Sequence, residues 1–192
     1  HGSMTARDDI IGPIHLASLG ILDPGEQATE LMLDYLSELM FSRNVCASQP
    51  YYSQHPILHL RRGEVKRFLK AYYNTMASMA DREIYSFWEH FYHESPHKTH
   101  EEAEFLMQTR WMLYMEDGET LKLLQGVPRA WLENGKRIKL DKVGSYFGPL
   151  SLEVESKVDR GLIEAKIIYN PKRKPKRVEI RLPHPEEKKA VS

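Results

Sequence analysis

Four histidines lie close together in the sequence SFWEHFYHESPHKTHEEAEF, which spans residues 86–105. On an unbroken helix, their spacing would place His90, His93, His97 and His100 on one face. Histidines with glutamates among them are a ligand set that zinc can bind. Pro96 argues against this arrangement, because proline lacks a backbone N–H and drives the preceding residue out of the helical region. We therefore expect the segment to break at Pro96, and we expect no metal site.

A new helix is predicted to start at Thr99, because Thr99 and Glu102 have the spacing of a capping box. The break leaves Trp88 and Glu89 on one side of a short loop. A sugar can stack on an aromatic ring, and a neighbouring carboxylate can activate water as a general base. The ordinary alternative, which the spacing itself favours, is a core tryptophan beside a surface glutamate.

Residues 44–60 contain two prolines, and we predict a long irregular loop there. Long loops in compact domains often have a function. Tyr51, Tyr52 and His55 are therefore candidates for lining a pocket. The alternative is that they are ordinary loop aromatics without a ligand.

Helical periodicity dominates the first two thirds of the chain. We predict helices over residues 26–40, 63–80 and 102–115, and a short helical turn near residues 119–124. Asp23, followed by Pro24, is the predicted N-cap of the first helix.

From residue 136 the apolar residues alternate with polar ones, which predicts half-buried strands near residues 138–140, 150–154, 163–167 and 178–182. The expected fold class is α+β, with helical hairpins followed by a small antiparallel sheet. The expected division is a residual expression-vector sequence at 1–4, a helical part at 5–132 and a sheet domain at 133–192. The last strands look incomplete, so we expect the sheet domain to be truncated.

Composition excludes several classes of protein. The chain has 27 basic and 27 acidic residues among 192, so we expect no nucleic-acid partner. Its single cysteine, Cys46, allows no intrachain disulfide. No apolar run is long enough to suggest a membrane span, and no motif indicates a cofactor.

Helical hairpins, then LLQGVPRAWLENGKRIKL and then strands, form an order that resembles the C-terminal end of bacterial six-hairpin glycosidases. In that family an α/α toroid precedes a β-sandwich, and YFGPLSLEVES and GLIEAKIIY are similar to consecutive sandwich strands. YSFWEHF resembles the aromatic-Trp-Glu motif that supplies the catalytic base of inverting α-L-rhamnosidases, which implies that Glu89 is the base. The histidine-rich segment SPHKTHEE departs from the rhamnosidase pattern, which leaves the sugar open.

The resemblance implies a fragment of a glycoside hydrolase that acts on bacterial or plant polysaccharide by inversion. In that interpretation Trp88, His97 and His100 line a sugar subsite, and the loop residues Tyr51, Tyr52 and His55 help to close it. The general acid would lie upstream of this chain, so we expect the fragment to be inactive by itself. A partial toroid would also expose apolar helix faces, which predicts self-association. The alternative is a non-catalytic carbohydrate-binding or scaffold domain.

Overall fold

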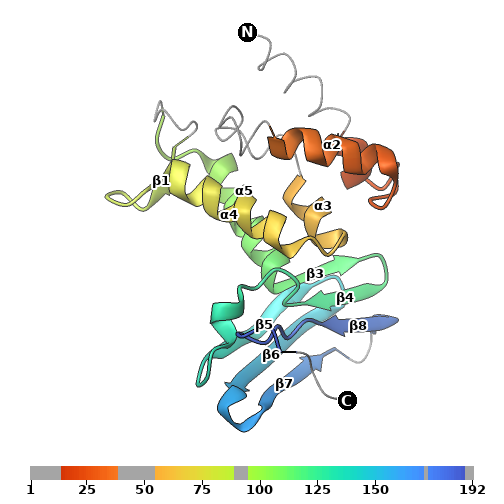
Figure 1. Ribbon diagram of the computed structural model, residues 1–192, viewed down its shortest axis with the longest axis vertical. Coiled ribbons are helices and arrows are strands. Elements are labelled where there is room, and N and C mark those ends of the chain that lie inside the picture. Colours follow the sequence, from red (N-terminus) through yellow and green to blue (C-terminus); the bar gives the residue numbers. More distant parts are fainter. Residues whose placement is uncertain (1–13, 39–54, 89–94, 171–172, 189–192) are drawn as a thin grey trace. The chain divides into compact units, whose positions relative to one another are not determined.

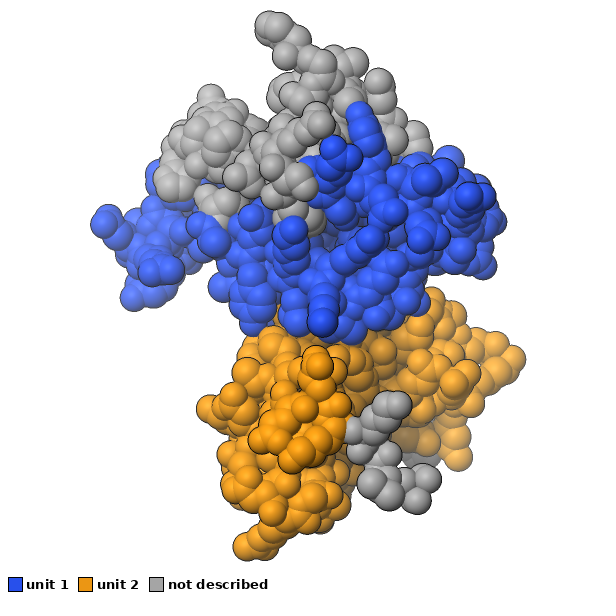
Figure 2. Space-filling view, viewed as in Figure 1, with its two compact units in different colours: residues 1–110 blue, residues 111–192 orange. Residues whose placement is uncertain are grey.

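The fold is mixed α+β, with helices in the first part of the chain and strands in the second (Figure 1). The computed structural model describes residues 14–38, 55–88, 95–170 and 173–188. Two compact units divide between Arg110 and Trp111, and Figure 2 colours them separately. We call residues 1–110 unit 1 and residues 111–192 unit 2. The boundary expected at residue 132 stays a prediction.

The helices of unit 1 follow the predicted periodicity in outline. Residues 14–18 are helical, and they are followed by α2 (Gln27–Ser37), α3 (His55–Arg61), α4 (Val65–Met79) and α5 (Thr99–Leu113), which continues into unit 2. α3 and α4 pack together as a helical hairpin. Gly63 lies between them with φ +75°, a conformation that glycine adopts without a steric penalty.

Two local predictions for unit 1 are wrong. The predicted loop over residues 44–60 is helical from His55 onward, because α3 packs its apolar residues against α4 and buries them. Asp23 is not the N-cap of α2, whose N-cap is Glu26. Asp23 instead closes the preceding turn: its Oδ1 accepts from the N–H of Gly25 at 2.6 Å, and its own N–H donates to Oε1 of Glu26 at 3.3 Å.

A small aromatic cluster joins α4, α5 and the short strand β2 (Ser86–Phe87). Tyr72 stacks on Phe68 with ring centroids 6.0 Å apart and on Phe105 at 5.5 Å, while Phe87 lies 5.0 Å from Phe105. The hydroxyl groups of Tyr72 and Thr109 share a hydrogen bond of 2.9 Å. These contacts fix the position at which the chain leaves β2 relative to the start of α5.

The described residues of unit 2 form two three-stranded sheets. One consists of β3 (Tyr114–Asp117), β4 (Thr120–Leu123) and β8 (Arg177–Ile180), and the other of β5 (Arg137–Ser145), β6 (Gly148–Lys157) and β7 (Leu162–Tyr169). The short 3-10 helices η3 (Arg129–Leu132) and η4 (Val158–Arg160) lie between strands in sequence. Buried apolar residues of β3, β4, β5 and β6 form the core, among them Met115, Leu121, Ile138 and Leu152.

The predicted strands are present, but the sheet differs from the prediction in two ways. Residues 120–123 form β4 rather than a helical turn, because Leu121 and Leu123 alternate with polar residues and the strand is paired on both sides. β4 and β8 run parallel, so the strands are not all antiparallel as expected. The pairing of segments more than 50 residues apart leaves no local trace in the sequence.

Candidate functional site

The segment that contains the sequence-predicted site residues begins with a tight hairpin. β1 (Ala80–Asp81) pairs antiparallel with β2, with Ala80 opposite Phe87. Oδ1 of Asp81 accepts from the N–H groups of Glu83 and Ile84 at 2.8 and 3.1 Å, which holds the turn. Trp88 follows β2, is half-buried, and donates its backbone N–H to the carbonyl of Met79 at 2.9 Å.

The two ends of this segment are joined by hydrogen bonds. The N–H of Lys98 donates to the carbonyl of Phe87 at 3.3 Å, and Oγ of Ser86 donates to Oε1 of Glu102 at 2.6 Å. We call these two bonds the neck. We call residues 88–97, the ten residues between Phe87 and Lys98 in the sequence, the loop; residues 89–94 lie outside the described residues.

His97 has φ +59°, a left-handed conformation that is uncommon for a residue other than glycine. Such conformations cost free energy and persist where the surrounding structure holds them, often at functional sites. Trp88 and His97 are the residues that directly follow Phe87 and precede Lys98, which are joined by the neck. His100 is exposed in the first turn of α5, two residues beyond the neck.

The remaining predicted residues lie elsewhere. Glu89, Tyr51 and Tyr52 lie outside the described residues. His55 belongs to α3, where its side chain is fully buried.

The helix that follows the neck has an unusual distribution of polar and apolar side chains. Glu101, Glu104 and Gln108 share one face of α5 at helical spacing and are buried, with exposed fractions of 2%, 9% and 1%. Nε2 of Gln108 donates to Oε1 of Glu104 at 3.5 Å. Leu106 and Met107, on the same helix, are 65% and 40% exposed.

Buried carboxylates are costly unless hydrogen bonds satisfy them, and Glu104 has such a partner in Gln108. Sequence reasoning missed this face because it assumed that the polar side of a helix points to solvent. This face could have been found from the helical spacing of Glu101, Glu104 and Gln108, which lie at positions i, i+3 and i+7.

A second cluster of ionisable groups lies between α3 and α4. Nδ1 of His59 and Oε2 of Glu64 lie 2.7 Å apart, and Nε of Arg62 donates to Oε1 of Glu64 at 2.9 Å. Burial would raise the pKa of Glu64, but the hydrogen bonds from Arg62 and His59 outweigh it and hold the pKa below its ordinary value. The carboxylate is therefore ionised and accepts from both neighbours.

The two histidines of α3 are neutral. Burial, followed by the proximity of His59, lowers the pKa of His55 from 6.5 to about 3. Burial also lowers the pKa of His59, against the opposing effect of Glu64. The two rings meet edge to face with centroids 5.7 Å apart.

A neutral imidazole oriented by a carboxylate is a familiar catalytic or metal-binding arrangement. Within the described residues, however, no group of three or more histidine, cysteine, aspartate or glutamate side chains is arranged to hold a metal ion. We therefore interpret the pair as part of the packing between α3 and α4.

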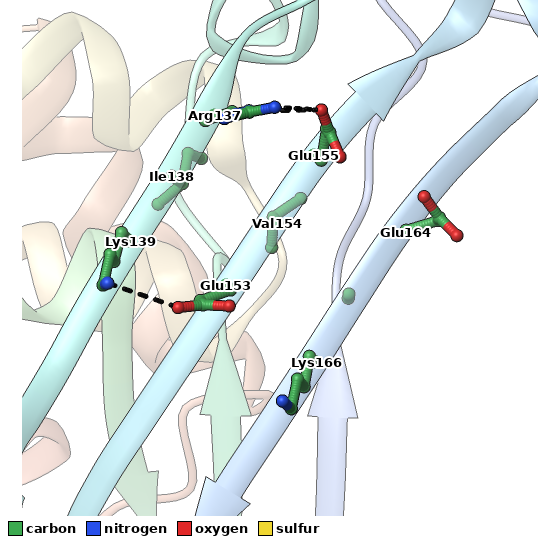
Figure 3. A pocket seen from close by; sticks show the side chains of 9 residues that line it. Arg137, Ile138, Lys139, Glu153, Val154, Glu155, Glu164 and Lys166 are labelled. Carbon is green, nitrogen blue, oxygen red and sulfur yellow. Dashed lines mark hydrogen bonds and ion pairs between the residues drawn. The ribbon is translucent and has the colours of Figure 1, made fainter.

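Unit 2 has a shallow groove on the polar face of the β5–β6–β7 sheet, with a volume of about 550 Å³ (Figure 3). A neighbouring hollow of about 530 Å³ shares Glu153 and Lys166 with it. The three carboxylates of the groove are all paired: Glu153 with Lys139 at 3.3 Å, Glu155 with Arg137 at 2.6 Å, and Glu164 with Lys157.

Hydrogen bonds from Arg137 and Lys157 lower the pKa of Glu155, which is therefore ionised at neutral pH. A lowered pKa is the opposite of what a general acid needs, and Glu153 and Glu164 are likewise paired with lysines. The groove is suited to binding rather than to catalysis.

Comparisons with protein-family models, with curated proteins and with solved structures find no match to this chain. No helix among the described residues combines the length and apolar character needed to cross a membrane.

Proposed function

We propose that the chain is part of a glycoside hydrolase that acts on polysaccharide by an inverting mechanism, with Glu89 as the general base. The observation that carries the proposal is the closed neck. It joins Phe87 and Lys98, the neighbours of Trp88 and His97, and Glu89 follows Trp88 directly in the sequence. An aromatic platform and hydrogen-bonding groups at one site are what a sugar ring requires.

The exposed apolar residues of α5 support the same proposal. The exposed Leu106 and Met107 suit a helix whose other side is covered in a larger helical array, as in an α/α toroid.

The proposed chemistry is half of an inverting hydrolysis. The Glu89 carboxylate takes a proton from a water molecule as that water attacks the anomeric carbon. The bond from that carbon to the leaving oxygen breaks, and the leaving oxygen needs a proton from a carboxylic acid on the other side of the bond. We assign that acid to another part of the enzyme, because the paired carboxylates of unit 2 do not suit the task.

A non-catalytic carbohydrate-binding domain is the second candidate, and the groove of unit 2 favours it. Its volume suits a small ligand, and Tyr169, which is 37% exposed, lines the neighbouring hollow beside Asn170 and Ser151. In this alternative the binding energy comes from the sheet and not from the loop of unit 1.

Calorimetric titration with a panel of neutral mono- and oligosaccharides separates the two candidates. If the loop of unit 1 is the site, Trp88→Ala abolishes binding and Tyr169→Ala leaves it unchanged. The reverse result favours the sheet groove.

Glu89→Gln adds a test of catalysis. It preserves the shape of the side chain but removes its negative charge, so a hydrolase loses affinity for ligands that mimic the positively charged transition state. Binding that survives Glu89→Gln for every ligand and is lost with Trp88→Ala would favour a lectin-like role.

A further inference from the structure

β7 forms an edge of its sheet. The strand order is β5–β6–β7, and within the described residues no strand pairs with the outer side of β7. Leu162 and Ile168 on this strand are 47% and 56% exposed. An edge of eight residues with exposed apolar side chains is a template for another strand, because its outward N–H and C=O groups are available for pairing.

The register with β6 assigns the side chains of β7 to two faces. Ile163, Ala165 and Ile167 lie opposite the buried Ser156, Val154 and Leu152 of β6, so they point to the core side. Leu162, Glu164, Lys166 and Ile168 alternate with them and point to the polar side. Figure 3 shows Glu164 and Lys166 on the outermost of the three strands, with their charged ends apart.

The sequence of β7, LIEAKIIY, is self-complementary about Ala165. If two copies pair antiparallel with Ala165 opposite Ala165, Glu164 of each copy faces Lys166 of the other. Ile163 then faces Ile167 and Leu162 faces Ile168. Every charged residue meets an opposite charge and every apolar residue meets an apolar one, which is the favoured composition of cross-strand pairs.

A shift of the register by two residues loses this match. With Ala165 opposite Ile167, Lys166 faces Lys166 and Glu164 faces Ile168. Like charges directly opposite each other are destabilising. The charge pattern therefore selects one register.

We propose that the outer edge of β7 binds the same edge of a second copy of this chain, in an antiparallel pairing centred on Ala165. The two copies are related by a two-fold axis, so the same surface serves both partners. Their two three-stranded sheets become one continuous sheet of six strands. The contact is short, so the dimer is weak and forms at micromolar or higher concentrations.

Lys157 already forms an ion pair with Glu164 within the chain. This pair does not prevent the proposed contact, because a carboxylate has two oxygens and accepts from two cations. Exposed pairs of this kind contribute little to stability and rearrange readily.

Charge reversal tests the proposal by sedimentation equilibrium. Lys166→Glu puts two glutamates opposite each other twice per dimer, and Glu164→Lys does the same with lysines. Each variant alone should dimerise at least about tenfold more weakly than the unsubstituted chain. An equimolar mixture of the two should recover dimerisation, because each variant supplies the charge that the other lacks.

Lys142→Glu is the matched control. Lys142 is exposed on β5 of the same sheet, so this variant changes the net charge by the same amount as Lys166→Glu without touching the edge of β7. It should dimerise like the unsubstituted chain. A chain that stays monomeric at hundreds of micromolar, or variants whose mixture dimerises no better than each alone, would overturn the proposal.

Cysteine cross-linking tests the register independently of the charges. In a Cys46→Ser background, Ala165→Cys places two sulfurs across the two-fold axis, at the separation of directly opposed residues. It should form a covalent dimer under mild oxidation.

Ile163→Cys, on the same face, should not cross-link, because it faces position 167 of the second copy. Equal cross-linking of the two variants would contradict the register. These outcomes are independent of sugar binding, so the dimer and the glycoside hydrolase proposal can fail separately.

Discussion

Burial determines the charge of His55. Its pKa falls from 6.5 to about 3 in the folded chain, first because the ring is buried and second because His59 is close. The unfolded chain therefore binds a proton between these two values and the folded chain does not. The contribution of the neutral His55 to the free energy of unfolding is fully present above pH 6.5. It is lost as the pH falls toward 3, at roughly 1.4 kcal/mol per pH unit. Burial of His59 acts in the same direction.

Replacing this residue should flatten the pH dependence of unfolding. The side chain in His55→Gln carries no charge at any pH. Between pH 6.5 and pH 5 the free energy of unfolding should fall in both proteins, but the fall in His55→Gln should be smaller by about 2 kcal/mol. Urea denaturation at the two pH values measures the difference. His100→Gln is the control, because His100 is exposed. An equal fall in unfolding free energy for His55→Gln and the unsubstituted chain would contradict the lowered pKa of His55.

The two hydrogen bonds of the neck join β2 to the start of α5 and to the residue before it. Ser86→Ala removes the hydrogen bond to Glu102 and with it one of the two connections across the loop. A hydrogen bond to a charged group contributes about 1.5–3 kcal/mol. The amide of Lys98 should therefore exchange with solvent at least tenfold faster than in the unsubstituted chain.

Hydrogen exchange measured by NMR gives this rate directly. Ser95→Ala lies in the same loop and takes no part in either neck bond, so it should leave the rate unchanged. A neck that opens no faster in Ser86→Ala would show that the loop is held by other contacts.

The aromatic cluster behind the neck provides a second test at this scale. Phe105→Ala removes the ring that touches both Tyr72 and Phe87, and the expected cost is about 2–4 kcal/mol of unfolding free energy. Leu106→Ala, one residue further along α5, should cost about 0.5 kcal/mol or less because that side chain is mostly exposed. Equal costs in thermal or urea denaturation would contradict the assigned faces of α5.

Sequence periodicity predicted the elements whose apolar residues repeat without interruption. α4 and β7 were predicted close to their observed bounds, since their patterns are strong, whereas β5 and β6 were found but extend well beyond the predicted residues 138–140 and 150–154. α3 was missed because Pro56 was taken as a loop residue, whereas it lies in the first turn of the helix, where proline fits. The parallel partner of β4 depends on contact between distant segments, which no local pattern reveals.

The candidate site was predictable only in part, for the same reason. Pro96 correctly indicated a break, and α5 begins at Thr99. The predicted capping box is wrong, because the carbonyl of Lys98 accepts from the N–H of Glu102 and the Glu102 carboxylate accepts from Ser86. The two bonds of the neck join residues 11 and 16 positions apart and have no sequence signature. The buried polar face of α5 went unrecognised because amphipathic reasoning assigns polar residues to solvent.

The proposal for the whole molecule is that unit 1 carries one half of a hydrolytic site. An inverting hydrolase needs both a base and an acid, and we assign only the base to this chain. The chain by itself should therefore not hydrolyse aryl glycosides above the rate of its Glu89→Gln variant, as measured by release of the aryl chromophore. Turnover at a rate normal for such enzymes would contradict this division of the site.

Binding of a cationic iminosugar tests the central claim most directly. Such a ligand mimics the positive charge that develops on the sugar ring in the transition state, so we expect it to bind to the Glu89 carboxylate. The account predicts that Glu89→Gln weakens iminosugar binding by tenfold or more in a calorimetric titration. It also predicts that Glu89→Gln leaves the binding of neutral sugars unchanged, and that Tyr169→Ala affects neither. Equal affinity of the iminosugar for the unsubstituted chain and Glu89→Gln would contradict the assignment of Glu89 as the catalytic base.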